Sequence, residues 1–489
     1  MTHLINMLQI IIKKINVNFP MDKIEYYRNK QRRDKHLAIF QENLDNIIKR
    51  VKERRDHPLF TDDIYDEFKR RLPPSKFILE QGKVIDLDKK QEKLAQSNAG
   101  LQKIKGVAGC GKTEVLIHRA VNAIKRTNAN SILILTYNNA LKPYIRYRVY
   151  NILRKVNEYK FNKIERDIFE ITNYHRFYIA QANNLCIHIQ TMLDNGQVNE
   201  HQFRKNIFLQ NTEKYEVILI DEIQDYEPEW IKIVRDSFLL ENGEMVIFGD
   251  QTQNIYKRDV GARESSLVHG FGKWQKLNKS YRSCLKLIDI FSKFKEEFLR
   301  EYKEENYEHT EPKQGTLDVS YETVVYKNIN SIDGACNCIR EIIVSNKLIQ
   351  NDTCVLASKI NILQQIESQF SYYEKTTTTF ETLSDIQKIE KSIEKMPDKK
   401  LQEKEKKSRI GNLRKIKKEH FHINSGLVKF STIHSFKGLE LKNVFVIVNA
   451  DDIAEIVYTG ITRSIENLFI ICIGNTKYDE FFKSVIDKS

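Results

Sequence analysis

A run of eight residues has the composition and spacing of a phosphate-binding loop. It fits G-x-x-x-x-G-K-[ST] at every fixed position, and it lies between an apolar-ended segment at 101–105 and a helical pattern from Val115 onward. Its glycines let backbone N–H groups curl around phosphate oxygens at the positive end of a helix, while Lys112 adds a charge and the Thr113 hydroxyl can hold Mg²⁺. The sequence therefore predicts an ATP-binding loop made of Gly106, Val107, Ala108, Gly109, Cys110, Gly111, Lys112 and Thr113.

Two adjacent acidic residues could supply the groups that hydrolysis of a bound nucleotide requires. Asp221 and Glu222 directly follow the apolar run 215–220, which has the pattern of a buried strand. This is the Walker B arrangement, in which Asp221 would orient Mg²⁺ and Glu222 would position and deprotonate the attacking water. One acid pair is weak evidence alone, but it becomes strong beside a complete phosphate loop. The predicted cofactors are therefore ATP and Mg²⁺.

Short apolar runs bounded by polar residues predict the strands that must hold these groups. In the first half they lie at 131–136, 168–172, 215–220 and 244–249, and ligands of open α/β sheets bind at the carboxyl ends of such strands. The second half repeats the rhythm, with strands expected at 315–326, 352–357, 428–432, 444–448 and 468–473, helices at 332–344 and 453–462, and a charged helical pair at 384–418. The pattern predicts an α/β protein with parallel sheets.

Several single residues near these strand ends have an ordinary structural explanation when taken alone. Gln91 lies on a short helical run ahead of the loop, where an amide can read an adenine edge, although spacing alone favours a surface glutamine. Gln253 and Tyr256 follow the strand at 244–249, and Arg282 stands in the segment 280–283. The stretch 144–150 mixes tyrosines with arginines, which suits nucleic-acid contact and equally suits a helix surface.

Composition favours a polyanionic partner and a reducing compartment. Lys and Arg total 79 against 66 Asp and Glu, so the net charge is +13, and nucleic acid leads the candidate partners. The seven cysteines are scattered, and the close pair at 336 and 338 lacks the second pair that a zinc site needs. No apolar run reaches the roughly 18 residues of a membrane span, and no secretory signal is evident. We therefore expect a cytoplasmic protein without membrane contact.

The order of these segments resembles the UvrD/Rep-like superfamily 1 helicases over roughly residues 87–474. The segments that match the family's motifs are, in order, Gln91, 106–113, 136–141, 174–177, 221–225, 249–256, 280–283, 432–440 and 458–464. Two departures stand out. Lys257 and Arg258 follow Tyr256 where relatives usually carry a further aromatic residue, and the gaps that hold large accessory subdomains in processive relatives are short.

The resemblance implies a role for each matched residue. It makes Gln91 an adenine reader, Gln253 a sensor of the γ-phosphate, and Arg282 and Arg463 arginine fingers. The predicted catalytic set therefore consists of Lys112, Asp221, Glu222, Gln253, Arg282 and Arg463. Tyr256 and Glu440 join the predicted ATP site, and Thr113 and Asp221 are the predicted metal ligands. The predicted nucleic-acid contacts are Thr136, Tyr137, Asn138, His175, Tyr256, His434 and Ser435.

The resemblance also implies two RecA-like domains. We expect a helical extension at 1–85, a first domain at 86–275 with a small helical insertion near 178–213, and a second domain at 276–489 with a helical hairpin insertion near 371–426. The implied activity is an ATP-driven translocase or helicase, 3′ to 5′ on single-stranded DNA, in repair, replication or phage defence. Small insertions favour translocation over strong unwinding.

Two alternatives stay open at this point. The strand contacts are largely to backbone and no reader of a 2′-hydroxyl is visible, so the strand could be RNA. Alternatively, the short insertions and the unassigned helices at the amino end favour an ATP-gated binding subunit that switches a partner such as a nuclease. No second catalytic constellation is visible in residues 1–85, so nuclease activity would have to come from that partner.

Overall fold

The structure is a computed structural model of the 489-residue chain. It describes residues 87–106, 109–127, 132–156, 169–190, 199–208, 212–250, 270–277, 285–300, 323–394, 396 and 398–486. The expected extension at 1–85 thus lies outside the described residues, as do the segments that contain Gln253, Tyr256 and Arg282.

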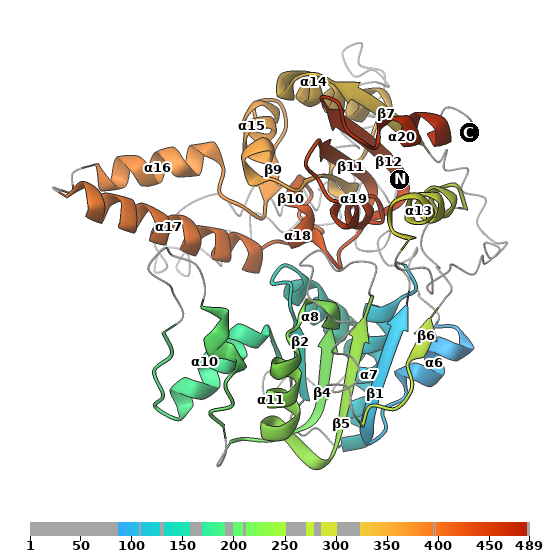
Figure 1. Ribbon diagram of the computed structural model, residues 1–489, viewed down its shortest axis with the longest axis vertical. Helices are drawn as coiled ribbons and strands as arrows, with labels where there is room; N and C mark the ends of the chain where they lie inside the picture. Colours follow the sequence, from blue (N-terminus) through green and yellow to red (C-terminus); the bar gives the residue numbers. More distant parts are fainter. Residues whose placement is uncertain are drawn as a thin grey trace, which may run out of the picture. The chain divides into compact units, whose positions relative to one another are not determined.

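The first half of the described chain forms a six-stranded, all-parallel sheet (Figure 1). Its order is β3-β2-β4-β5-β1-β6, with bounds β1 Gly100–Gly106, β2 Ile132–Thr136, β3 Phe169–Thr172, β4 Tyr215–Asp221, β5 Leu239–Gly249 and β6 Gln275–Leu277. Residues of β2 alternate between two cores: Ile132 and Ile134 face one, Leu133 and Leu135 the other. Both faces are thus covered, as in other parallel sheets.

Helices on the two faces of this sheet fix the ends of the strands. The helices α6 Lys89–Ala95, α7 Lys112–Thr127 and α8 Leu141–Val156 contribute to one core, and α10 Tyr174–Asn184 and α11 Pro228–Phe238 to the other. The largest fully buried side chain, Trp230 of α11, stacks on Tyr174 of α10 at 4.8 Å between ring centroids. Loops between β-strands and these helices therefore emerge from rigid supports.

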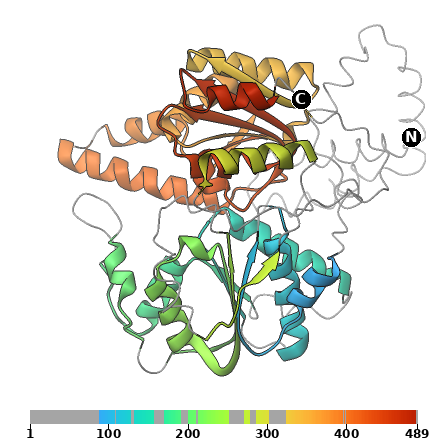
Figure 2. The same cartoon turned by 45° about the vertical axis from the view of Figure 1, so that its right-hand side comes forward.

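The second half forms another six-stranded parallel sheet, in the order β7-β12-β11-β8-β10-β9. Its red strands lie between helices in Figure 2. The strands are β7 Val324–Ile329, β8 Thr353–Ala357, β9 Thr376–Thr378, β10 Val428–Thr432, β11 Leu441–Asn449 and β12 Ser464–Ile473. One face packs against α14 Ile332–Ser345 and α15 Ile360–Phe370, and the other against α13 Leu285–Phe298, α18 Ile433–Phe436, α19 Ala454–Ile461 and α20 Asp479–Ile486. The two sheets confirm the predicted α/β class and are consistent with two RecA-like domains.

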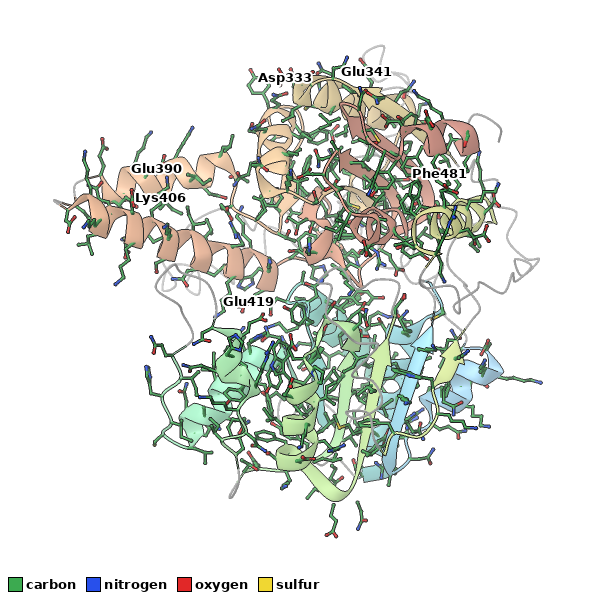
Figure 3. All side chains as sticks on the ribbon, in the orientation of Figure 1. Asp333, Glu341, Glu390, Lys406, Glu419 and Phe481 are labelled. Atoms are coloured by element: carbon green, nitrogen blue, oxygen red, sulfur yellow. The ribbon has the colours of Figure 1, made fainter. Side chains whose placement is uncertain are left out.

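The charged helical pair is present as α16 Leu383–Ile393 and α17 Lys399–Glu419, which pack side by side (Figure 1). Lys406 of α17 donates to Glu390 of α16 at 2.5 Å, and Figure 3 labels both. At the base, Arg414 donates to both carboxylate oxygens of Glu381 at 2.8 and 2.6 Å. This bidentate pair fixes α17 to the segment that precedes α16.

Some sequence expectations differ from the fold. The strand β9 lies inside the range 371–426 that we assigned to an insertion, yet it pairs with β10 at the sheet edge. It is only three threonines long, too short for the strand pattern to be recognised. The helices α13 and α15 were not anticipated, and β7 extends to Ile329 rather than ending at 326. Within the described part of the chain, no helix combines the length and apolar character needed to cross a bilayer.

Candidate active site

The phosphate loop connects β1 to α7, as its sequence predicts, and its glycines fill positions that no other residue could take without strain. Gly109 and Gly111 both have φ +81°, in the left-handed region that favours glycine. A Cβ on Gly106 would lie 2.6 Å from the Leu277 carbonyl oxygen, and one on Gly111 would lie 2.7 Å from Gln91 Nε2. The loop is therefore tightly enclosed. Its members Val107 and Ala108 lie outside the described residues.

Gln91 lies against the loop, with 3% of its surface exposed. Its Oε1 accepts from Asp88 N and its own N–H donates to Asp88 Oδ1, which makes a capping box at the start of α6. Its Nε2 donates to the Cys110 carbonyl at 2.9 Å. In this structure Gln91 therefore links the cap of α6 to the backbone of the phosphate loop. Cys110 itself is buried.

Lys112 reaches across its own loop to the end of β5. Its Nζ lies 2.6 Å from the Gly106 carbonyl oxygen and 3.2 Å from Asp250 Oδ2. Burial alone would lower the pKa of Lys112, but Asp250, together with Cys110 and Glu222, outweighs burial and raises this pKa above its ordinary value. Lys112 is therefore a fully charged ammonium, held at the carboxyl edge of the sheet where an anion can meet it.

Thr113 and Asp221 meet at the same edge, from α7 and β4. The Thr113 hydroxyl donates to Asp221 Oδ2 at 3.3 Å, and the backbone N–H of Glu222 donates to Asp221 Oδ1 at 3.0 Å. Burial and the neighbouring Glu222 raise the pKa of Asp221 to about 7, although Lys112 and these hydrogen bonds oppose the shift. The Asp221 carboxylate is thus poorly compensated in this environment.

The hydroxyl oxygen of Thr113 and the carboxylate of Asp221 are suitable ligands for a magnesium ion. Mg²⁺ prefers oxygen ligands and is commonly bound by one or two protein groups together with substrate phosphates and water. Among the described residues, no cluster of three or more His, Cys, Asp or Glu side chains forms a self-sufficient metal cage. Thr113 and Asp221 would accordingly hold the ion together with the nucleotide.

Glu222 adopts a left-handed backbone with φ 55°, directly after the last residue of β4. Its Oε2 accepts from Gln224 Nε2 at 2.5 Å, and the Gln224 Oε1 accepts from Asp250 N at 3.0 Å. The backbone strain of such a position costs about 1 to 3 kcal/mol and is a feature of functional sites. Gln224 thereby connects Glu222 to the residue that holds Lys112.

Lys437 brings the second sheet into this network. It lies just after α18, and only 2% of its side chain is exposed. Its Nζ lies 2.9 and 2.7 Å from the two carboxylate oxygens of Asp225, and 3.7 Å from Glu222 Oε2. A cation from the segment 432–440 therefore neutralises the acids that follow β4.

Two residues that we predict to contact nucleic acid, one from each sheet, are hydrogen-bonded to each other. Asn138, which follows β2, donates from Nδ2 to the carbonyl oxygens of Ser435 and Lys437 at 2.8 and 2.6 Å. A Cβ on Gly438 would lie 2.8 Å from the Leu141 side chain, so glycine permits this close approach. The segment after β2 and the segment around α18 are therefore hydrogen-bonded directly.

The other residues that we predict to contact nucleic acid differ in how far their side chains are exposed to solvent. Thr136 is fully buried, and its hydroxyl has no hydrogen-bond partner among the described residues. Tyr137 packs edge-to-face on His175 and on Tyr226, with centroid separations of 6.3 and 6.1 Å. Burial, with Lys437 and Lys418 nearby, lowers the pKa of His434 to about 4, so this imidazole is neutral. Tyr137, His175 and His434 keep partial exposure, whereas Thr136 does not offer its side chain to solvent.

Arg463 lies at the end of α19 and is 2% exposed. Its Nε donates to the Thr459 carbonyl at 2.9 Å and a terminal nitrogen donates to the Thr462 hydroxyl at 3.2 Å. The guanidinium is thus bonded to the last turn of its own helix in this structure. Glu440 directly precedes β11 and is partly exposed. Gln253, Tyr256 and Arg282 lie outside the described residues, as does Arg258.

Sequence reasoning left four members of this network without a role: Gln224, Asp225, Asp250 and Lys437. All lie within the motif segments, so a signal was present. Nothing in the sequence indicates which polar residue of such a segment points inward, because that depends on the left-handed turn at Glu222 and on the approach of the two sheets.

Comparison with known protein families agrees with this geometry. Residues 91–259 match a family model described as an AAA domain. The matched segment begins at Gln91 and includes the phosphate loop, the acids after β4 and Asp250. A search of curated proteins returned no match. The match supports placing residues 91–259, which include strands β1 to β5 and the phosphate loop, in the P-loop ATPase superfamily.

Proposed function

We propose that this protein is an ATP-driven translocase that moves along a single strand of nucleic acid, with single-stranded DNA as the expected track. The observation that supports this most strongly is the position of the segment 432–440. It contacts Asp225 through the Lys437 ammonium and Asn138 through the Ser435 and Lys437 carbonyls. Lys437 also lies 3.7 Å from Glu222 Oε2, so one short segment joins a proposed hydrolytic acid to the proposed strand contacts.

In this proposal each charged group has a distinct task. Lys112 would bind the β- and γ-phosphates of ATP, and Thr113 and Asp221 would hold a magnesium ion, which would supply positive charge next to these phosphates. Glu222 orients the attacking water and accepts its proton, while Gln224 fixes the direction of the Glu222 carboxylate through its 2.5 Å hydrogen bond. Arg463 would have to leave the end of α19 to reach the nucleotide.

Coupling to the strand follows from the same contacts. A change in the position of α18 on strand binding would move Lys437 relative to Asp225 and Glu222, and hydrolysis would move α18 in return. Tyr137, His175, His434 and Ser435 would contact the strand, and ring stacking, worth about 1 to 3 kcal/mol per base, does not depend on sequence. Repeated approach and separation of the two sheets would then move the protein along the nucleic-acid strand.

The small size of the hairpin α16–α17 favours translocation over extensive duplex unwinding. The same observation favours the second candidate function, an ATP-gated binding subunit that acts on a partner such as a nuclease. A strand-displacement assay with the full chain separates them. ATP-dependent displacement or directional movement on single strands supports the translocase, whereas ATP-dependent binding without movement supports the switch.

The assay should include both nucleic acids and both polarities. ATP turnover measured with oligo(dT) and with oligo(U) distinguishes a DNA track from an RNA track. Substrates with a 3′ or a 5′ single-stranded tail report the direction, for which we expect 3′ to 5′. Absence of any stimulation by either oligomer would contradict the proposal.

A further inference from the structure

Lys142 is a buried lysine without a counter-ion in direct contact. It lies in the first turn of α8 and keeps 7% of its surface exposed. It forms no hydrogen bond or ion pair with another described residue. Burying an ammonium in this way is costly unless something outside the protein compensates it.

The groups around Lys142 are mostly cationic as well. Arg176 of α10, Arg146 of α8 and Lys415 of α17 all lie close enough to repel its charge, and Glu419 at the end of α17 is the acid that attracts it. Burial, reinforced by Arg176, lowers the pKa of Lys142 to about 8. We call these five residues the cationic seam.

Part of the positive charge of the cationic seam is neutralised by its own acidic residue, Glu419. Arg176 forms an ion pair with Glu419, whose side chain keeps 28% exposure against 46% for Arg176. Glu419 is labelled at the end of α17 in Figure 3. Because this pair is solvent-accessible, it contributes little to stability, and an anion with more charge can displace the carboxylate.

We propose that the cationic seam binds a backbone phosphate of a nucleic-acid strand. Arg176 can bind phosphate oxygens in a bidentate manner, Lys142 supplies a point charge, and the amino end of α8 adds the partial positive charge of its first turn. The proposal rests on the proposed function, because it assigns a further contact to the same strand.

The position of the seam suits this role. Arg176 follows His175, and Lys142 lies four residues after Asn138, so the seam adjoins the proposed strand contacts. Lys415 and Glu419 belong to the hairpin, and Lys417 of the same helix donates to the Thr378 hydroxyl of β9, at the edge of the second sheet, at 3.0 Å. A phosphate in the seam would therefore be held jointly by elements attached to both sheets, and it would restrain their relative movement.

The test measures binding of oligo(dT) to the full chain as a function of salt concentration. Each lost phosphate contact reduces the slope of log K against log salt by about one. We expect Lys142→Gln and Lys415→Gln each to weaken binding and to lower this slope, whereas Lys404→Gln should leave both unchanged. Lys404 is the matched control, since it is an exposed lysine on the same helix, α17, near its other end.

Glu419→Gln gives a result that a merely structural role would not produce. Removing the internal carboxylate frees Arg176, so binding should become about tenfold tighter, the effect of about 1.4 kcal/mol. The wild type should also bind more weakly as pH rises through about 8, while Lys142 loses its proton, and Lys142→Gln should lose that dependence. The other charged groups that act on Lys142 are Arg176, Glu419, Arg146 and Lys415.

The outcomes separate this proposal from the proposed function. If oligo(dT) stimulates ATP turnover but Lys142→Gln binds with the wild-type affinity and slope, the seam proposal is wrong and the translocase stands. If no oligomer stimulates turnover but the seam variants still lower the slope, the phosphate site stands and the translocase fails. Weaker binding by Glu419→Gln would also overturn the seam proposal.

Discussion

Asp225 and Lys437 form a buried ion pair, with Nζ 2.9 and 2.7 Å from the two carboxylate oxygens, although 212 positions separate them in the sequence. Each side chain is only 2% exposed. Because one partner follows β4 and the other follows α18, the pair links the acids of the first sheet to the second sheet. Four predictions concern this pair, the charged groups of the candidate active site, and a buried lysine of the second sheet.

Lys437→Met should destabilise the protein and uncouple strand binding from hydrolysis. Removing one member of a buried pair leaves an uncompensated charge and typically costs about 3 to 5 kcal/mol. Urea unfolding measures the first effect, and ATP turnover with and without oligo(dT) measures the second. The double variant Asp225→Asn with Lys437→Met removes both charges and should recover most of the stability without recovering stimulation. Stimulation at the wild-type level in the double variant would show that the pair is purely structural.

Lys112→Ala should abolish ATP turnover, by at least about a hundredfold, because it removes a charge placed to stabilise developing negative charge on phosphate. Binding of oligo(dT) should be largely retained, since Lys112 contacts Gly106 and Asp250 rather than any proposed strand contact. Turnover and fluorescence anisotropy measure the two properties. The variant Lys112→Ala with Asp250→Asn controls for the unpaired Asp250 carboxylate. Normal turnover in the single variant would exclude the loop as the hydrolytic site.

Arg463→Ala should keep ATP binding and lose turnover by about a thousandfold, the usual contribution of an arginine finger. Arg463→Lys should recover little, because a lysine keeps the charge but cannot reproduce the planar fork of donors. Binding of a fluorescent ATP analogue is compared with steady-state turnover. A variant that loses nucleotide binding with unchanged turnover per bound nucleotide would contradict the finger role. Since Arg463 bonds to Thr459 and Thr462, thermal unfolding controls for damage to α19.

Lys429→Met should make stability less dependent on pH in the alkaline range. Lys429 is fully buried in β10, its Nζ donates to backbone carbonyls of Asn351 and Leu427, and burial lowers its pKa to about 7. Between this value and the ordinary lysine pKa, the unfolded chain binds more protons than the folded chain, so Lys429 makes stability rise with pH.

Unfolding free energies in urea at pH 7 and pH 9.5 would measure this effect. The wild type should gain more stability across this interval than Lys429→Met, and the exposed control Lys404→Met should behave as the wild type. An equal gain in all three proteins would mean that Lys429 keeps its proton when folded.

Local pattern was sufficient to predict most of the regular elements. The run at 215–220 is apolar at nearly every position, which only a strand covered on both faces tolerates, and it became β4. The edge strand β9 could not be found this way, because three threonines carry no periodicity and form a strand only where β10 offers hydrogen bonds.

The chemistry available at the phosphate loop and at Asp221 and Glu222 is predictable from residue types and spacing alone. These residues act through positions fixed by a strand, a turn and a helix that are adjacent in the chain, so spacing is a sufficient guide. The parallel α/β class is predictable in the same way, through apolar runs that must be buried on both faces.

Which distant groups lie in contact depends on the packing of the whole fold. The Lys437–Asp225 pair, the Asn138 hydrogen bonds to the Ser435 and Lys437 carbonyls, and the cationic seam at Lys142 each join segments far apart in the sequence. Their energies depend on burial and on distances of a few ångströms between the two sheets, and neither quantity is encoded in local spacing.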